Sequence, residues 1–488
     1  MPLRNRTDTF VLLIAAVAAF FSVEAAAQPP ASNSPAVTAP DPIQILVDTR
    51  CGTPRKRGCW IKLTGSDFGS FDSVALARTC ANFDGAATVG GTPCTGRGPS
   101  PWSSDSAVNQ GGMSGIGLTR SYWEYTSGDI RESDGLTCVW GSGHTNGGDS
   151  SIYCFSIRDA AAAMNAGEKE GKWTLRVPSA RFVSAAAGKP EWSNQGFGTE
   201  PGRPYYWATT NRDGVKMPIG CHSYKLTQFI PGDNKLSLNG LFCFSDNASM
   251  SMGSAYFYDD TLNSNDGMVG PVTIPFGTHN SGTAFGLVQL FNSFGVNLGF
   301  SSIDHNAYSI GFDKGAGHYV LYRISGYMSQ SSIAISEVGS CERTGNFNQD
   351  ALVIPDPVNG AGHEAYFQDL GVNAGFLIFL DITNSPAIGC QYSRYASYPS
   401  YKLPESSGYT WDSKRKVIAF CTGDKHIYNI IPNSDLDKWR GSEPNTDYSG
   451  DFPAFSPDGP ANFVRLKYLP HEDLYAMLNH GDLYLMVP

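Results

Sequence analysis

The sequence predicts an all-β fold, a single β-propeller of six or seven four-stranded blades with a short helical insertion in one loop. Three observations predict this fold. Short strand-like runs alternate with turns rich in Gly, Asp and Asn, in a chain of 488 residues that contains 54 glycines and 30 prolines. Helical patterns are scarce. One strand–turn–strand template recurs at intervals of roughly 40 to 80 residues, which is the scale of a propeller blade with loop insertions.

The first 27 residues have the organisation of a secretory signal peptide. Arg4 and Arg6 precede an apolar core at residues 10–23, and small residues follow at 25–27. The alternative is a retained membrane anchor, but the apolar run is shorter than a full span of about 20 residues. We therefore expect a secreted or periplasmic protein with a signal peptide (1–27), a flexible Pro/Ser/Ala-rich linker (28–45) and the propeller (46–488).

The eleven cysteines indicate the redox compartment of the protein, and the formal net charge of −10 bears on its partners. Cysteines in this number fit an oxidising compartment, and none of them has the CxxC spacing of a zinc ribbon. Their order along the chain suggests four local bridges, Cys51–Cys59, Cys80–Cys94, Cys138–Cys154 and Cys221–Cys243, and leaves Cys341, Cys390 and Cys421. At least one thiol then remains in the monomer that we expect. The acidic balance, with few polybasic runs, argues against a nucleic-acid partner.

The repeated template joins an aromatic-rich strand through a polar turn to a second, more hydrophobic strand. Its copies begin at Tyr122, His222, His305, His363, Tyr409 and Phe463. A seventh blade could lie in residues 276–302, and the helical insertion is expected at residues 158–172. Single hairpins cannot bury both faces, whereas radially packed blades can. The segment "KWTLRV" (172–177) fits an outer strand, and "GCWIKLTG" (58–65) could close the ring against the C-terminal blade.

The segment "VWGSGHTNGG", followed by "SSIYCFSI", resembles the kelch pattern of a hydrophobic strand, a glycine pair, a polar loop and an aromatic-rich strand. From about Cys51 to Pro488 the chain resembles secreted bacterial kelch propellers and the central domain of galactose oxidase. The resemblance implies the fold much more specifically than the function, because propellers carry many activities.

Histidines are the main candidates for a functional site. We expect His222, His305 and His363 at the start of innermost strands, and His144 in the loop between the second and third strands of the first blade. In a propeller these positions open on one funnel mouth, where His279 can join them. The alternative is that each histidine satisfies backbone groups between blades.

Polar and aromatic side chains near these histidines are candidates for binding sugar rings and hydroxyls. Tyr206 and Trp207 precede the second blade, and Tyr366 follows His363 by three residues, which points it to the other strand face unless the strand bulges. Ordinary packing between blades is the alternative for such aromatic residues. Asn146 and Asn280 stand in the same loops as His144 and His279.

These residues favour a carbohydrate-active protein that cleaves uronic-acid polysaccharides or oligosaccharides by β-elimination. The reaction needs a base, an acid and a group that neutralises the substrate carboxylate. We assign the base or carboxylate-binding roles to His144 and His222, and the acid to Tyr224. Arg203 or Arg181 is the candidate neutralising group.

Two other classes remain open. One is a non-catalytic propeller that binds a glycan or a protein at the cell surface. The other, less favoured, is a copper radical oxidase with two His and two Tyr ligands, for which no cysteine can be identified as the one cross-linked to a tyrosine. No cofactor is required by the lyase hypothesis. Calcium is a candidate ligand of the Asp-rich loop at residues 258–267, although such loops are more often simply solvated turns.

Overall fold

The protein is seen here as a computed structural model, in which one compact unit extends from Asp41 to Pro488. The structure describes residues 40–64, 88–89, 92–93, 128–140, 151–177, 208–210, 215–218, 225–238, 242–245, 248–251, 254–273, 298–313, 318–341, 350–369, 376–384, 388–393, 408–421, 423, 425–435, 438–442, 447–453, 464–479 and 481–488. Within these residues no helix is both long and apolar enough to cross a membrane.

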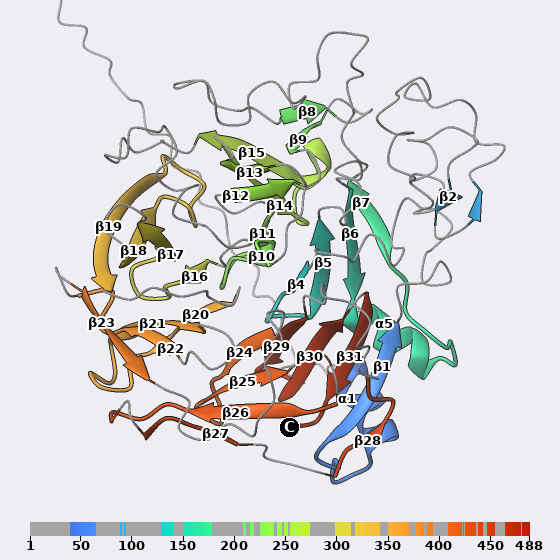
Figure 1. The fold of residues 1–488 in the computed structure, drawn as a ribbon. Helices are drawn as coiled ribbons and strands as arrows, with labels where there is room; N and C mark the ends of the chain where they lie inside the picture. The colour runs from blue at the N-terminus through green and yellow to red at the C-terminus, as the bar shows by residue number, and fades with distance from the viewer. Residues whose placement is uncertain are drawn as a thin grey trace, which may run out of the picture. The chain divides into compact units, whose positions relative to one another are not determined.

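The described strands form a six-bladed β-propeller of four-stranded antiparallel sheets, which confirms the predicted fold class (Figure 1). Blade 1 consists of β4 (Gly128–Ile130), β5 (Leu136–Trp140), β6 (Ile152–Ser156) and β7 (Thr174–Val177). Blade 2 consists of β10 (Gln228–Phe229), β11 (Lys235–Ser237), β14 (Ser254–Asp259) and β15 (Met268–Thr273). Blade 3 consists of β16 (Gly299–Phe300), β17 (Ala307–Asp313), β18 (His318–Ser325) and β19 (Ala334–Cys341).

The second half of the ring follows the same plan. Blade 4 consists of β20 (Ala351–Pro355), β21 (Glu364–Asp369), β22 (Phe376–Phe379) and β23 (Ile388–Ser393). Blade 5 consists of β24 (Gly408–Asp412), β25 (Val417–Cys421), β26 (Ile427–Ile431) and β27 (Arg440–Ser442). Blade 6 consists of β29 (Arg465–Leu469), β30 (Leu474–Asn479), β31 (Asp482–Met486) and β1 (Cys59–Thr64).

Three hairpins, the two α-helices, the 3-10 helix η3 (Asn265–Gly267) and the short strand β28 (Ser449–Gly450) complete the described elements. The hairpins are β2 (Thr88–Val89) with β3 (Thr92–Pro93), β8 (Ala208–Thr210) with β9 (Lys216–Pro218), and β12 (Phe242–Ser245) with β13 (Ala248–Ser251). Helix α5 (Ile157–Asn165) lies between β6 and β7, which confirms the helical insertion in blade 1. It ends earlier than expected because Ala166 and Gly167 form a turn in which Gly167 has φ of +99°.

The N-terminal strand closes the ring, as the sequence predicted. Strand β1 pairs antiparallel with β31, with Trp60 opposite Met486 and Ile61 opposite Leu485 (Figure 1). On its other edge β1 pairs in parallel with β28 (Ser449–Gly450). Gly450 has φ of +82°, and a Cβ there would lie 2.2 Å from the Trp60 carbonyl oxygen, so this close approach requires glycine.

Helix α1 (Pro42–Cys51) was not predicted. Asp41 caps it by accepting a hydrogen bond from the Ile43 N–H at 2.9 Å, and Pro42 occupies the first turn, where its missing N–H costs nothing. The helix buries Ile43, Leu46 and Val47. Residues 42–45, expected in the flexible linker, are therefore helical.

The hydrophobic core is divided into clusters that lie between neighbouring blades. One cluster joins β29 and β30 of blade 6 to β5 and β6 of blade 1 and also takes in the buried face of α1. The cluster between blades 4 and 5 contains stacked rings, with Phe367 and Trp439 centroids 6.2 Å apart. Equivalent clusters join blades 1 and 2, 2 and 3, 3 and 4, and 5 and 6. Burial between blades thus supplies the ring with apolar contacts at every junction.

Two of the predicted repeats are displaced by one strand. The copies beginning at His305 and His363 were expected to contain the first and second strands of their blades. They contain the second and third, β17–β18 and β21–β22. The first strand of blade 3, β16, is only two residues long and ends the segment in which a seventh blade was considered. The strands that the structure describes form six blades.

Three disulfides are described. Cys51–Cys59 and Cys138–Cys154 confirm two predicted pairs, and Cys341–Cys390 joins two cysteines that the sequence left unassigned. Cys421 is buried and carries a thiol, 3.5 Å from Met477 Sδ. The predicted pairs Cys80–Cys94 and Cys221–Cys243 involve residues outside the described part of the chain.

Candidate functional site

Charged side chains from several blades meet where the innermost strands converge. Lys225, just before β10, places its Nζ 2.6 Å from Asp350 Oδ2, just before β20. Arg465, the first residue of β29, lies 3.5 Å from carboxylate oxygens of both Asp350 and Asp129. All four side chains are at most 4% exposed. Charges this deeply buried are tolerated only when they are paired and hydrogen-bonded. We call Asp129, Lys225, Asp350 and Arg465 the axial network.

The axial network also bonds to the backbone of neighbouring inner strands. Asp129 Oδ2 accepts from the Phe229 N–H at 2.8 Å, and Asp350 Oδ2 accepts from the Tyr409 N–H at 3.0 Å. Arg465 donates to the carbonyl oxygens of Gly128, Lys225 and Thr227 at 2.8–3.1 Å. Blades 1, 2, 4, 5 and 6 are connected by these bonds. The axial network is therefore a structural hub.

The chemistry of Lys225 agrees with that role. Burial lowers the pKa of its ammonium below the usual 10.5, while the adjacent Asp350 carboxylate favours the charged form. A lysine with a lowered pKa can act as a base elsewhere, but this side chain is fully buried against its partner. Sequence reasoning missed all four residues, because none of them belongs to a motif or a spacing that marks a functional site.

The antiparallel order of each blade defines two ends of the ring. At one end the chain enters the innermost strand, and the second strand connects to the third; we call it the entrance end. At the other, the turn end, lie the turns between first and second strands and between third and fourth strands. Lys225 and Asp350 precede their innermost strands and mark the entrance end.

Most of the predicted site residues belong to segments that the structure does not describe. These are His144, Asn146, Arg181, Arg203, Tyr206, Trp207, His222, Tyr224, His279 and Asn280. Their assigned roles remain predictions. Three predicted residues, His305, His363 and Tyr366, lie in described segments.

His305 and His363 do not start innermost strands, and that expectation was wrong. His305 lies in the turn between β16 and β17, is exposed and has φ of +55°. His363 lies between β20 and β21. Both positions belong to the turn end, because the innermost strands β16 and β20 precede these histidines, one strand earlier in the chain than the repeat pattern indicated.

His363 takes part in a hydrogen-bonded cluster that orders two turns of blade 4. Its Nδ1 lies 2.8 Å from Asp381 Oδ1 and 3.1 Å from Asn384 Nδ2. Asp381 N–H donates to Asp356 Oδ2 at 2.7 Å. The hydrogen bond with His363 lowers the pKa of the Asp381 carboxyl. The cluster matches the alternative in which such a histidine satisfies nearby polar groups.

Tyr366 lies on β21 in the core between blades 3 and 4 and is 0% exposed. Its ring packs edge-on against Phe379 with centroids 6.2 Å apart, and its hydroxyl donates to Gln368 Oε1 at 3.1 Å. This position fits the packing alternative for the aromatic residues.

Metal ligands are sparse in the described residues. Two carboxylates of the loop considered for calcium already have partners, because Asp259 accepts from Thr261 and Asp260 pairs with Arg131 of blade 1 at 2.5 Å. Within the described segments, one group of three potential ligands comes together, Asp41, His471 and Glu472. Arg158 already lies 2.9 Å from Asp41 and 3.6 Å from Glu472, so a cation there would have to displace a guanidinium. Calcium binding remains a prediction.

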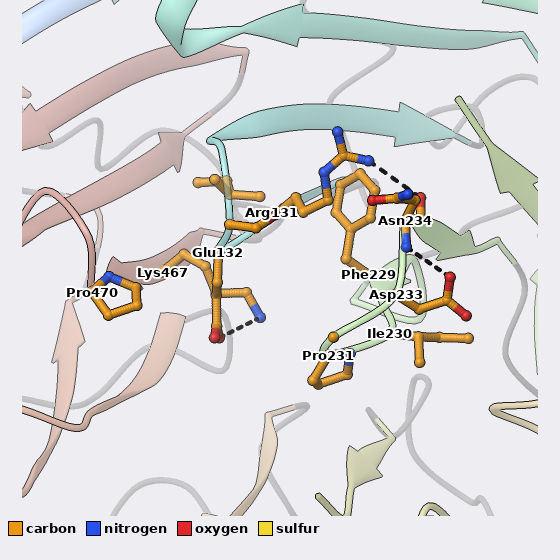
Figure 2. Close-up of a pocket in the computed structure, with 12 residues that line it drawn as sticks. Arg131, Glu132, Phe229, Ile230, Pro231, Asp233, Asn234, Lys467 and Pro470 are labelled. Atoms are coloured by element: carbon orange, nitrogen blue, oxygen red, sulfur yellow. Dashed lines mark hydrogen bonds and ion pairs between the residues drawn. The ribbon is translucent and has the colours of Figure 1, made fainter. Parts of the chain in front are cut away.

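A cavity of about 340 Å³ is found at the turn end, between the first turns of blades 1, 2 and 6 (Figure 2). It is lined by residues 130–133 and 229–234, together with Lys467 and Pro470. Its volume falls in the range of small-molecule sites, which begins at roughly 300 Å³.

Comparison with known proteins assigns the chain to no family. No protein-family model matches the chain, and no curated protein matches it. Solved structures with a similar arrangement include the periplasmic gluconolactonase PpgL of Pseudomonas aeruginosa (11% identity, TM-score 0.33, covering 75% of this chain and 89% of that one). Kuenenia stuttgartiensis hydrazine synthase (9% identity, TM-score 0.37, covering 75% and 96%) is another. A third is a putative 6-phosphogluconolactonase from Bacteroides uniformis (11%, 0.33, covering 72% and 82%).

At these identities and TM-scores we base no argument about activity on the likeness. The class that the described residues define is a disulfide-bonded six-bladed β-propeller. The resemblance to kelch and galactose-oxidase propellers stays a prediction within that class.

Proposed function

We propose that this protein is an extracytoplasmic, carbohydrate-active propeller that cleaves uronic-acid glycans by β-elimination at its entrance end. The disulfides of the described residues are consistent with an oxidising compartment, as the signal-like N-terminus led us to expect. The finer assignments, to a lyase and to a secreted or periplasmic location, rest on the sequence.

The observation that carries the proposal is the fixed start of the innermost strand of blade 2. Lys225 is anchored in the axial network, and Tyr224 and His222 precede it by one and three residues. Consecutive Cα atoms are about 3.8 Å apart, so Tyr224 and His222 cannot lie far along the chain from the buried Lys225. In blade 1, next to it, the segment with His144 connects β5 to β6, a connection that also belongs to the entrance end.

The proposed chemistry uses only side chains of this chain. A neutral histidine removes the proton next to the substrate carboxylate, and the electron pair forms a carbon–carbon double bond as the glycosidic C–O bond breaks. Tyr224 donates its proton to the leaving oxygen. Arg203 or Arg181 pairs with the carboxylate while negative charge develops on it. No water is consumed.

The test is incubation with alginate, polygalacturonate, hyaluronan and chondroitin, while the ultraviolet absorbance of the new conjugated double bond is followed. We expect turnover of at least one of these polymers and a rate that rises through the histidine pKa near 6.5. His222→Ala and Tyr224→Phe should each lower kcat by about 100-fold or more. His471→Ala, which removes an exposed imidazole at the turn end, is the matched control.

No absorbance change with any of the four polymers would refute the lyase assignment. Binding of a polymer without turnover would identify the alternative, a non-catalytic glycan-binding propeller. If His222→Ala lowered the unfolding midpoint as much as the activity, the histidine would be a packing residue.

A further inference from the structure

The cavity at the turn end is a preformed site that the proposed lyase reaction does not use. Its inner wall consists of Ile130, Phe229 and Ile230, each at most 4% exposed. The Arg131 guanidinium lies over the Phe229 ring at 5.4 Å from its centroid. Asp134 and Asp260 hold that guanidinium at 2.5 Å each. Because the wall is buried and the Arg131 guanidinium is held by two carboxylates that do not line the cavity, these side chains have partners within the protein itself.

Two opposite charges stand side by side at the cavity. Lys467 Nζ is 3.7 Å from Glu132 Oε1 (Figure 2). It is also 3.5 Å from Asp129 Oδ2. Both distances exceed an ordinary N–H···O hydrogen bond of about 2.7–3.2 Å, so the ammonium retains donor capacity. The Glu132 side chain is 49% exposed and can accept further hydrogen bonds.

The mixture of charges decides which ligand fits. An anion would meet Glu132 and Asp233, and a cation would meet Lys467 and Arg131. A hydroxyl group suits both signs, because it accepts from an ammonium and donates to a carboxylate. Pro231 and Pro470 offer apolar surfaces on two sides of the cavity, against which the C–H face of a ring can pack (Figure 2).

We propose that this cavity binds a neutral sugar unit, with Lys467 and Glu132 hydrogen-bonding its hydroxyls. The site goes beyond the proposed lyase reaction, since its lining residues belong to the turn end and include none of the residues assigned to catalysis. It would let the propeller hold a neutral part of a glycan separately from the uronic acid cleaved at the entrance end.

The test is titration of the full chain with glucose, galactose, mannose and N-acetylglucosamine, with binding measured by saturation-transfer NMR. Galacturonic acid and glucosamine serve as charged counterparts. We expect millimolar binding of at least one neutral sugar and at least several-fold weaker binding of the charged sugars. Glu132→Gln should weaken binding about tenfold, the effect of losing one hydrogen bond to a charged group.

Lys467→Met is not a suitable test, because it also removes an ion-pair partner of buried Asp129. A variant that leaves the axial network intact is needed. Ser133→Trp places a large side chain at an exposed position of the lining and should abolish binding. Val358→Trp adds the same ring to the first turn of blade 4 and should leave binding unchanged; Val358 is 44% exposed.

Two results would overturn the proposal: no binding of any of the four neutral sugars, or binding that Ser133→Trp leaves intact. A preference for galacturonic acid or glucosamine over the neutral sugars would overturn it as well. His222→Ala should not change neutral-sugar binding, so failure of the lyase assignment and failure of this site are separately visible.

Discussion

Lys225 and Asp350 show how single residues hold this ring together. A fully buried ammonium 2.6 Å from a buried carboxylate gains little net stability over an apolar pair of the same size. Removing one partner is different, because it leaves an uncompensated charge in the interior. The same carboxylate accepts the Tyr409 N–H of blade 5 and lies 3.5 Å from Arg465 of blade 6.

Lys225→Met should therefore lower the free energy of unfolding by about 3–5 kcal/mol. The matched control is Lys438→Met, which removes an exposed ion pair with Asp435 and should cost at most about 1 kcal/mol. Urea unfolding followed by tryptophan fluorescence measures both. Equal, small losses in the two variants would contradict the structural role of the axial network.

None of the axial network could be predicted from the sequence. Asp129, Lys225, Asp350 and Arg465 lie on, or just before, the innermost strands of four different blades, and no spacing relates them. Only three-dimensional closure brings them within 3.5 Å. His144 and His222 were singled out instead because motif reasoning favours residues with recognisable chemistry, and their roles remain untested.

At the scale of elements, blades 3 and 4 share an edge. Their outer strands β19 and β23 pair in parallel, with Gly339 opposite Ile388, and Cys341–Cys390 bridges the same two strands. This pair could not be predicted, because the two cysteines are 49 residues apart and no local spacing suggested it. The local bridges Cys51–Cys59 and Cys138–Cys154 could be predicted from their proximity in sequence.

Removing the Cys341–Cys390 bridge with paired Ser substitutions should destabilise the protein more than removing Cys51–Cys59. Sequence separations of 49 and 8 residues correspond, in the chain-entropy model, to about 4 and about 2.5 kcal/mol. Urea midpoints of the two double variants measure the difference. A larger loss for the shorter loop would show that helix docking, rather than chain entropy, dominates.

Ion pairs and hydrogen bonds connect the first turn of blade 5 to the first turn of blade 6. Asp473 accepts hydrogen bonds from Arg415 at 2.8 Å, Lys414 at 2.6 Å and the Tyr468 hydroxyl at 2.9 Å. Burial opposes ionisation of this carboxyl, but these hydrogen bonds outweigh it and lower the pKa of Asp473 from 3.8 to about 2.

Between those two pKa values the unfolded carboxyl binds more protons than the folded one, so stability falls as pH falls. The contribution of Asp473 is complete above its unfolded value and lost as pH drops through about 2. Asp473→Asn should therefore flatten the loss of stability between pH 4 and pH 2, measured as urea midpoints. Asp435→Asn, at an exposed pair, should keep the wild-type slope; an unchanged slope in Asp473→Asn would refute the linkage.

At the scale of the whole molecule, the repeat pattern was sufficient for the fold class but not for strand register. Blades 1, 2, 5 and 6 begin where the template indicated. Blades 3 and 4 do not, because the template was matched to their longer second strands, β17 and β21, instead of to β16 and β20. The closing strand was predictable, since "CWIKLT" has a strand pattern but no neighbour in sequence with which to pair.

Closure by β1 makes the two ends of the chain interdependent. Residues 41–64 contribute the buried side chains Ile43, Leu46, Val47, Trp60, Ile61 and Leu63. At about 1.5–3 kcal/mol each, their burial is comparable to the whole net stability of a typical protein, about 5–15 kcal/mol. A chain that lacks residues 1–64 should therefore lose cooperative unfolding in calorimetry. Because the edge of β31 is then unprotected, this chain should also associate in size-exclusion chromatography.

A chain that lacks only residues 1–40 keeps the compact unit and should unfold as the full chain does. Adding residues 41–64 as a separate peptide should restore the transition to the shorter chain. If the chain without residues 1–64 instead unfolded at the full-length temperature, ring closure by the N-terminal strand would not be what stabilises the propeller.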